Sequence, residues 1–272
     1  RENQDNFAQS LTGLEQIFQR HQDYVERHTS LLKDALTWER QQKQTEFLLL
    51  GDTRQVAEAW LQQRFKDEQP PCLPTDLHCE FITESIKNAH NMMTHVFLAY
   101  AQADDEIMKN VRRSLWRQGF TVWSNQTDIA TGEAFKRAVN RGIEEADTMV
   151  YLLSPASLQS KYCQYEFAYA LALNKRVIPI LVRPLGASTS PPDLASLQYI
   201  DLTDNLSQKD YQLDESDLIK ALNQDAVYYS QHKSLLVKAL RWKRQQQNLS
   251  VLLRGYDLRH AEAWLKTATG RS

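Results

Sequence analysis

Glu166 is the residue of this chain whose type and position could most directly do chemistry. It lies near the start of an expected helix, three residues after Cys163 and soon after an expected strand that ends at Ser154. A glutamate there can simply reflect the helix dipole, which favours negative charge near a helix start. A fixed carboxylate can also stabilise an oxocarbenium-like positive charge, as in glycoside cleavage. The residue by itself leaves both interpretations open.

The three cysteines, Cys72, Cys79 and Cys163, add no clear chemistry. Their odd number and the lack of CxxC spacing argue for a reducing compartment, with the cytoplasm as the default, rather than for a disulfide framework. His78 stands beside Cys79 but no second spaced pair follows, so we expect no metal site and interpret the segment as a linker with free thiols. Cys163 has no nearby His in the sequence, and we interpret it as a packed thiol.

The chain has 272 residues and a formal net charge of -2. This length is enough for more than one core. Near-neutral charge argues against a nucleic-acid or anionic-membrane binder. No apolar run reaches the roughly 18 residues of a membrane-spanning helix, and the start has no signal-peptide pattern. Because the first residue is not Met, we treat the chain as a fragment whose parent could have a membrane segment.

The middle of the chain alternates short apolar runs with amphipathic helices, which predicts a parallel sheet covered by helices on both faces. Pro179 within the fourth run cannot donate to a ladder, so the edges of that strand are uncertain from sequence. The expected strands lie at 95–100, 120–123, 148–153 and 177–182, and the expected helices at 107–118, 134–146 and 162–174.

A set of spaced motifs in this region is similar to the Toll/interleukin-1 receptor (TIR) domain. The motifs are Phe97-x-Ala99-Tyr100-x-x-x-Asp104, Gly119-Phe120-x-Val122-Trp123, Gly132, Leu153-Ser154-Pro155, Ser160-x-x-Cys163-x-x-Glu166 and Val177-Ile178-Pro179. The resemblance implies a flavodoxin-like α/β fold over residues 93–205, with five parallel strands in the order 2-1-3-4-5. Ligands then bind at the carboxyl ends of the strands.

TIR domains act either as adaptors that only assemble or as enzymes that break the nicotinamide–ribose bond of NAD. Glu166 matches the glutamate that marks the enzymes, so the resemblance implies NAD as substrate, with no cofactor and no metal. Family contacts to the substrate carry over to six further positions: Tyr100, Ala101, Asn125, Gly132, Ser154 and Tyr162.

Two departures from the family pattern keep the alternatives open. Ala101 stands where a serine is common, and Asn125 replaces the usual aspartate in the loop that governs assembly. The leading hypothesis is an NAD glycohydrolase of bacterial defence or signalling, activated by TIR self-assembly and giving linear or cyclic ADP-ribose. The alternatives are a non-catalytic TIR scaffold and a domain that transfers ribosyl groups to other bases.

The two copies of an internal repeat lie before and after this domain in the sequence. Residues 28–61 align with residues 232–265, with about half the positions identical, including Trp38/Trp242 and Trp60/Trp264. Each copy predicts a helical hairpin whose first helix runs on to Gly51 or its counterpart and whose tryptophans form the core. The copies, assigned to residues 1–92 and 206–272, resemble a helical module of bacterial conflict and signalling proteins. We expect them to contact other domains or protomers.

Overall fold

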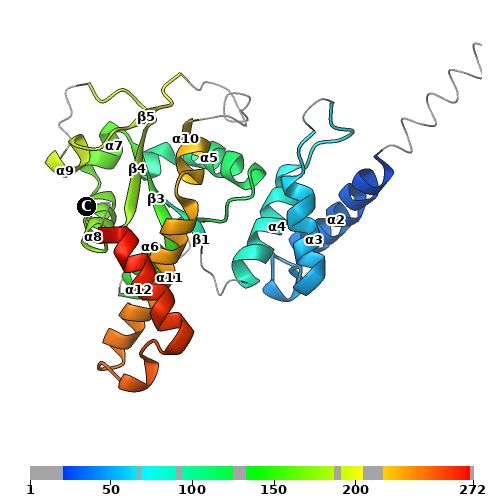
Figure 1. Cartoon of the computed structure of the whole chain (residues 1–272). Coiled ribbons are helices and arrows are strands. Elements are labelled where there is room, and N and C mark those ends of the chain that lie inside the picture. The colour runs from blue at the N-terminus through cyan, green and yellow to red at the C-terminus, as the bar shows by residue number, and fades with distance from the viewer. Residues whose placement is uncertain are drawn as a thin grey trace, which may run out of the picture. The chain divides into compact units, whose positions relative to one another are not determined.

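The computed structural model describes residues 21–65, 69–89, 94–124, 133–186, 191–204 and 217–269. The chain forms two compact units, one of residues 1–89 with 116–119 and one of residues 90–115 with 120–272. Figure 1 labels most of the helices and strands of both units. None of the described helices is both long and apolar enough to cross a membrane.

The first unit is a small helical module. It contains α2 (Gln22–Arg40), the 3-10 helix η1 (Thr45–Phe47), α3 (Gly51–Gln62) and α4 (Asp76–Ala89). Trp38 and Trp60 are each only 2% exposed, and the Trp60 indole donates a hydrogen bond to the Tyr24 carbonyl oxygen at 3.1 Å. The prediction that the two tryptophans form the core of a hairpin is confirmed for this copy.

Two sequence-based expectations for this unit are wrong. His78 and Cys79 do not lie in a linker, because both are buried on α4, where desolvation raises the pKa of the Cys79 thiol to about 12. Gly51 does not end a helix. The first helix stops at Arg40, the chain turns through Gln42 and Lys43 with positive φ, and Gly51, with φ of 50°, begins α3. The apolar residues before Gly51 have a spacing typical of a helix, but most of this run has an irregular backbone.

The second unit is built on a five-stranded parallel sheet in the order β2-β1-β3-β4-β5, as expected. Its central strand β3 is buried along its whole length, as a strand covered on both faces must be. Pro179 lies inside β4, but β5 pairs with β4 only from Ile180, so one side of β4 has no described neighbour at the proline. The strands are β1 (Thr94–Ala99), β2 (Val122–Ser124), β3 (Ala146–Leu153), β4 (Arg176–Leu181) and β5 (Ile200–Asp201).

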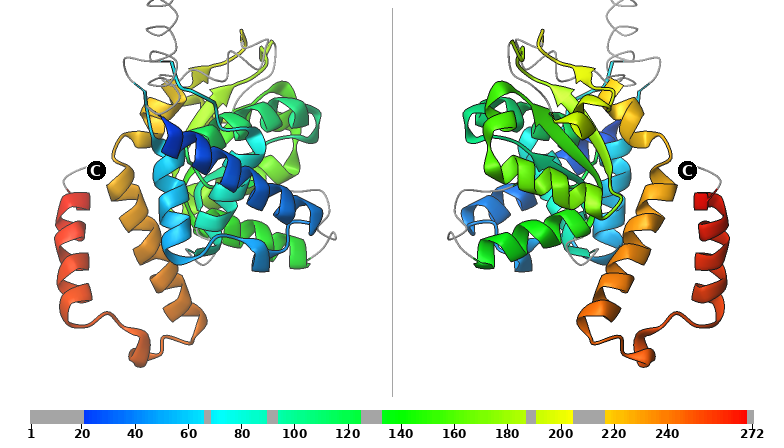
Figure 2. Two further views of the ribbon diagram at one scale, coloured as in Figure 1. Left: turned by 90° about the vertical axis from the view of Figure 1, so that its right-hand side faces the viewer. Right: turned by 90° about the vertical axis from the view of Figure 1, so that its left-hand side faces the viewer.

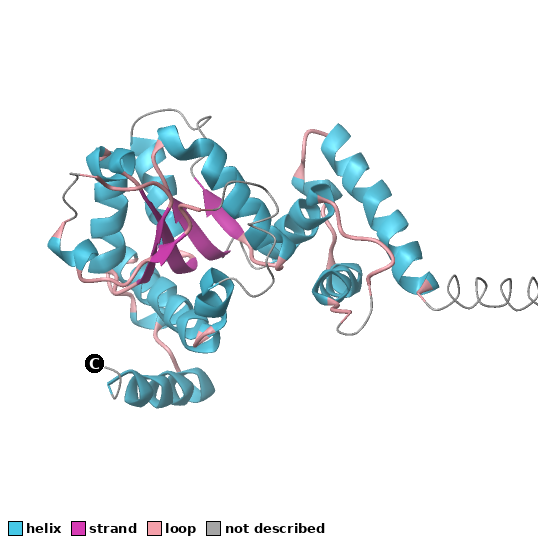
Figure 3. Cartoon of the chain, turned by 90° about the horizontal axis from the view of Figure 1, so that it is seen from above, coloured by secondary structure: helices cyan, strands magenta, loops and turns pink. Residues whose placement is uncertain are grey.

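Helices lie on both faces of this sheet (Figure 3). The helices of one face, which lie between residues 133 and 195, pack on an apolar core that includes Phe97, Ile143 and Leu153. The helices of the two faces are α5 (Asp105–Arg117), α6 (Glu133–Glu144), α7 (Pro155–Gln159), α8 (Lys161–Ala172), α9 (Pro192–Ala195) and α10 (Asp217–Asn223).

The second copy of the repeat belongs to the same unit as the sheet. It consists of α11 (Ala226–Arg244), η4 (Leu249–Val251) and α12 (Gly255–Thr269). Positive φ recurs at Gln246, Gln247 and Gly255, the counterparts of Gln42, Lys43 and Gly51. The repeat therefore extends to the backbone conformation of the turn. Figure 2 shows α11 between the sheet and α12.

Gly142 on α6 lets that helix approach the sheet closely. A Cβ atom at this position would lie 2.7 Å from Cδ2 of the Trp123 ring, which itself stacks on Phe97 at 4.7 Å between centroids. We expect Gly142→Ala to lower the free energy of unfolding by about 1–3 kcal/mol, because the rigid indole must move and this outweighs the better helix propensity of alanine. Urea unfolding measures the change, and a second change, Trp123→Leu, should restore part of the loss. An unchanged midpoint for Gly142→Ala would contradict the close approach.

Candidate functional site

Two consecutive helix starts after β3 position Glu166. Ser154 caps α7: its hydroxyl accepts a hydrogen bond from the Ser157 amide at 3.0 Å, and the Ser157 hydroxyl accepts one from the Ser154 amide at 2.9 Å. Ser160 then caps α8 by accepting from the Cys163 amide at 3.3 Å. These caps satisfy amide groups that a helix start leaves without partners. The caps thereby fix the position of α8 relative to the carboxyl end of β3. Glu166 lies in the second turn of α8, so its position is fixed as well.

The environment of Glu166 is not that of a solvated helix-surface residue. The side chain is 4% exposed, and it makes no hydrogen bond or ion pair with any residue that the structure describes. Desolvation raises its pKa from 4.5 to about 8. A carboxyl group held apart from water with a pKa near the working pH is characteristic of functional sites. This favours the chemical interpretation of Glu166 over the helix-dipole one.

Two aromatic residues of the predicted site, Tyr100 and Tyr162, differ in their surroundings. Tyr100, at the end of β1, is half-buried, and burial first and then the charges of neighbours that include Glu166 raise its pKa. Tyr162 is 64% exposed and meets Phe135 edge to face at 5.9 Å between centroids. Tyr162 therefore has a free face on the surface near the start of α8. Its contact with substrate stays a prediction.

Tyr165 and Phe167 are used in packing, as expected. The Tyr165 hydroxyl donates to Asn140 at 2.7 Å, and Phe167 packs edge to face on Tyr151 at 5.8 Å between centroids. Cys163 is a buried thiol whose pKa is raised to about 11 by desolvation, so it is protonated at neutral pH and is a poor nucleophile.

A buried network joins the loops after three strands. The Ser154 hydroxyl donates to Asp104 Oδ2 at 2.5 Å, and Arg183 Nε donates to Asp104 Oδ1 at 2.6 Å. Asp104 is fully buried, Ala101 is 7% exposed, and Arg183 is half-exposed. Sequence reasoning quoted Asp104 as a motif residue but did not assign it a role, and it missed Arg183. The signal for Asp104 was its spacing from Tyr100.

Two of the predicted site residues, Asn125 and Gly132, lie outside the described residues. The remaining predicted positions gather at one edge of the sheet: Tyr100 and Ala101 follow β1, Ser154 follows β3, and Tyr162 and Glu166 lie on α8. This is the carboxyl edge of the strands, where ligands bind in open parallel sheets.

A second group of buried charges lies at the opposite, amino edge of the sheet. Lys233 of α11 pairs with Asp147 at 2.8 Å and donates to the Thr94 carbonyl oxygen at 3.1 Å. Lys175 donates to the carbonyl oxygens of Glu144 and Ala146, and desolvation lowers its pKa to about 7. The bonds of Lys233 connect α11 to the sheet, whereas those of Lys175 join the residue before β4 to the start of β3.

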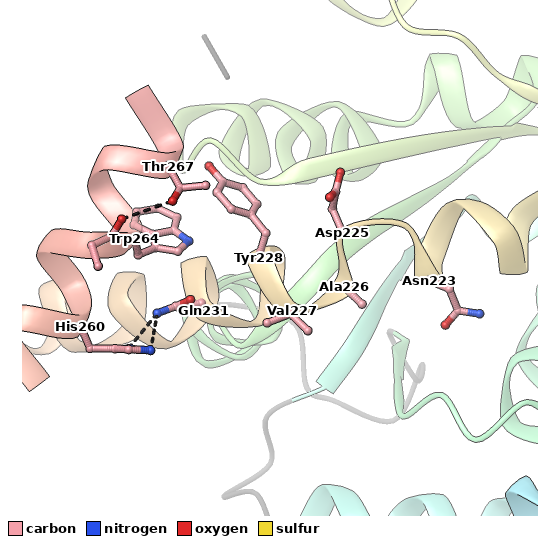
Figure 4. A pocket seen from close by; sticks show the side chains of 10 residues that line it. Asn223, Asp225, Ala226, Val227, Tyr228, Gln231, His260, Trp264 and Thr267 are labelled. Carbon is pink, nitrogen blue, oxygen red and sulfur yellow. Dashed lines mark hydrogen bonds between the residues drawn. The ribbon is translucent and has the colours of Figure 1, made fainter. Parts of the chain in front are cut away.

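Each helical hairpin has a surface hollow, and Glu166 lines neither of the two. One of about 540 Å³ is bordered by Tyr228, Gln231, His260 and Trp264 (Figure 4). The other, of about 580 Å³, is bordered by the counterparts of these residues in the first hairpin. Because the same hollow recurs in both copies, it follows from the geometry of the hairpin and is weak evidence for a ligand.

The sheet domain is similar to known TIR domains. The family model of the TIR domain matches residues 96–217. The Stimulator of interferon genes protein of Magallana gigas is 28% identical over 140 residues, 49% of this chain and 32% of that protein. The 2' cyclic ADP-D-ribose synthase BtTIR of Bacteroides thetaiotaomicron is 24% identical over 89 residues, 31% of each. The match thus spans about a third of each of these relatives.

Two solved structures resemble the chain in part. The TIR domain of the Toll-related receptor TRR-2 from Hydra magnipapillata is 26% identical, covering 41% of this chain and 86% of that chain, with a TM-score of 0.37. A TIR-STING receptor from C. gigas in complex with 2',3'-cGAMP is 26% identical, covering 47% and 39%, with a TM-score of 0.38. Both TM-scores are low, so the assignment of the domain depends on the family match and the observed strand order.

Proposed function

Because this chain contains a TIR domain over residues 96–217, we propose that it cleaves the nicotinamide–ribose bond of NAD. The observation that carries the proposal is Glu166, a buried carboxyl group without a described partner at the carboxyl edge of the sheet. A relative that matches part of the domain is named as a 2' cyclic ADP-D-ribose synthase. NAD is the substrate in this proposal, and no cofactor or metal takes part.

The chemistry breaks one bond and forms one. The bond from the ribose C1' carbon to the nicotinamide nitrogen breaks, its electron pair leaves with neutral nicotinamide, and C1' becomes oxocarbenium-like. Water then adds at C1' and loses a proton to give ADP-ribose. In a cyclic product, a hydroxyl group of the same molecule adds instead. Ionised Glu166 stabilises the positive charge in a site from which water is excluded.

The substrate itself favours the ionised form of Glu166. The nicotinamide ring of NAD is cationic, and a positive charge close to a carboxyl group lowers its pKa. Glu166, whose pKa of about 8 reflects desolvation in the free chain, would release its proton as NAD binds. Tyr100 and Tyr162 offer aromatic surfaces for the nicotinamide and ribose. Association between TIR domains completes the site in this proposal, so the rate per protomer rises with protein concentration.

The proposal is tested by measuring release of nicotinamide from NAD, with chromatographic identification of ADP-ribose or its cyclic form. We expect turnover by the chain at concentrations that drive assembly, and loss of at least about 100-fold in Glu166→Ala, because the transition-state charge loses its carboxylate. Glu262→Ala, which removes an exposed glutamate of α12, is the matched control and should retain full activity. Turnover that persists in Glu166→Ala would remove Glu166 from the chemistry.

A non-catalytic TIR scaffold is the second candidate, and one observation favours it. Ala101 has no hydroxyl, and the Ser154 hydroxyl is already bonded to Asp104 and Ser157, so neither side chain offers a free hydroxyl to a phosphate group. A chain that assembles in light scattering but leaves NAD intact at every concentration would support this candidate and contradict the enzyme.

A further inference from the structure

Arg183 is the only positively charged residue among the described residues that directly follow a strand of the sheet. These stretches are residues 100–104, 154–157, 182–186 and 202–204. The Val182 amide donates to the Leu153 carbonyl oxygen at 3.0 Å, so one more backbone bond joins the two chains where β3 and β4 end. This bond fixes Arg183 at the carboxyl edge of the sheet, beside the loop that begins at Ser154.

One edge of the Arg183 guanidinium group is held by the loop after β1. Its Nε atom donates to Asp104 Oδ1 at 2.6 Å, and its Nη2 atom donates to the Ala103 carbonyl oxygen at 3.4 Å. Asp104 is fully buried, and its other oxygen accepts from the Ser154 hydroxyl at 2.5 Å. Because the guanidinium group is rigid and planar, bonds along one edge fix the direction in which the opposite edge points.

The opposite edge has the N–H groups of Nη1 and the second N–H group of Nη2. Within the described part of the chain, no residue accepts a hydrogen bond from Nη1, and Asp104 is the only ion-pair partner. The Arg183 side chain is 52% exposed, whereas that of Asp104 is 0% exposed. A ligand that arrives from solvent therefore meets the guanidinium group first, with the neutralising carboxylate behind it. Two parallel N–H groups on one edge match two oxygens of a phosphate group.

Asp104 and Glu166 lie in the same neighbourhood. Desolvation is the main cause that raises the pKa of the Cys163 thiol to about 11, and the charges of Glu166 and Asp104 contribute to the rise. Both carboxyl groups are thus close enough to act on one buried thiol. The guanidinium group that Asp104 holds therefore belongs to the same part of the carboxyl edge as Glu166.

We propose that Arg183 binds the pyrophosphate group of the dinucleotide substrate through the free edge of its guanidinium group. This inference rests on NAD as the substrate proposed above. The pyrophosphate of NAD has negative charge on both phosphates and is attached to the ribose on the side away from the nicotinamide. A cation beside Glu166, rather than at the reacting carbon, matches this arrangement of charges.

The same network explains how phosphate is bound without a serine at position 101. Ala101 has no hydroxyl group, and the Ser154 hydroxyl is bonded to Asp104 and to the Ser157 amide. Ser154 and Asp104 instead hold the guanidinium group in place, so the contact to phosphate passes from a hydroxyl to Arg183. The site then selects nicotinamide nucleotides over nicotinamide riboside, which has no phosphate.

The probe is ADP-ribose, which has the pyrophosphate group and whose binding can be measured without any turnover. Isothermal titration calorimetry should show affinity at least about tenfold lower in Arg183→Gln than in the natural chain, because a charge-assisted contact to phosphate is lost. Arg259→Gln changes the net charge equally at an exposed position of α12, and as the matched control it should leave the affinity unchanged.

Salt dependence separates a contact with phosphate from a loosened loop. Exposed charge interactions weaken as salt is added, so affinity in the natural chain should fall between about 50 and about 300 mM salt. In Arg183→Gln the fall should be smaller, because one ionic contact is missing. If Arg183 served only to neutralise Asp104, its replacement would lower affinity and leave the salt dependence as it was.

Three results would overturn the assignment of Arg183. One is equal affinity for ADP-ribose in the natural chain and Arg183→Gln, which would leave cleavage of NAD by Glu166 untouched. Another is weaker binding by Arg183→Gln with an unchanged salt dependence. The third is the absence of ADP-ribose binding up to millimolar concentration. By contrast, a tenfold loss with reduced salt dependence in a chain that never cleaves NAD would support the phosphate contact and refute the enzyme.

Discussion

Replacing Glu166 by glutamine is expected to abolish NAD cleavage while making the folded chain more resistant to unfolding at pH 8. Burial raises the pKa of this carboxyl group from 4.5 to about 8, so the folded state holds a proton that the unfolded state releases. The stabilising contribution of that proton is complete below pH 4.5 and is lost as the pH rises to 8. Glutamine has no such loss. The gain over the natural chain at pH 8 is on the order of a few kcal/mol.

The two effects are measured separately. Urea unfolding of the natural chain and of Glu166→Gln at pH 5 and pH 8 gives the stability difference, which should grow with pH. A cost of burying the amide would be the same at both pH values and cancels in this comparison. Nicotinamide release should fall by at least about 100-fold in the variant. Glu262→Gln should change neither quantity. A stability difference that is the same at both pH values would contradict the raised pKa.

The same pKa predicts the pH dependence of the natural chain. If the ionised carboxylate does the chemistry, kcat/KM for NAD reports ionisation in the free chain. With a pKa of about 8 for Glu166, the ionised fraction rises roughly tenfold between pH 7 and pH 9. We expect a rise of that size in kcat/KM across this interval. A profile that is flat from pH 6 to pH 9 would exclude Glu166 as the titrating group.

The sheet domain could be predicted from sequence because its signals are local and repeated. The apolar runs that become β1, β3 and β4 are separated by helices of regular period, and each strand lies within two residues of its expected position. The second strand begins later than expected, at Val122, since the chain after Gly119 first turns and Thr121 bonds to His95. The strand order came from the family resemblance and not from the pattern, and the register was not predicted.

The helical copies were harder, because their structure depends on contacts that no local pattern shows. The apolar run before Gly51 resembles the end of a helix, but positive φ at Gln42 and Lys43 ends α2 earlier. The segment at His78 and Cys79, rich in small and polar neighbours and preceded by prolines, resembled a linker. It forms a helix, and packing of one face of this helix on Trp38 and Trp60 stabilises it. Tertiary packing decided both cases.

The burial of Glu166 could not be predicted, whereas its position could. The motif places the residue on α8, but the depth of the carboxyl group depends on how α8 packs beside β1, which is far away in sequence. The bond from Ser154 to Asp104 spans 50 residues for the same reason. Spacing within a motif indicates which residues face one edge of the sheet, but it does not show which of them bond to each other.

Asp104→Ala is expected to lower both stability and activity, because Asp104 holds together the loops that follow β1, β3 and β4. Its removal leaves the buried Ser154 hydroxyl without an acceptor and deprives Arg183 of its partner. Arg183 is half-exposed and can turn to water, so the buried hydroxyl and the lost packing dominate. We expect a loss of about 2–4 kcal/mol in the free energy of unfolding, measured by urea denaturation.

Activity should respond to Asp104 more steeply than stability, and this separates a positioning role from general destabilisation. Tyr100 and Ala101 precede Asp104 in the same loop, so loosening the loop moves surfaces that contact NAD in the proposed site. We expect KM for NAD to rise in Asp104→Ala under conditions where the chain is still folded, with partial recovery in Asp104→Asn, which can still accept from Ser154. Glu106→Ala removes a surface ion pair to Lys109 and should cost less than about 1 kcal/mol with KM unchanged. An Asp104→Ala chain that is less stable but has a normal KM would show that the network supports the fold and not the substrate.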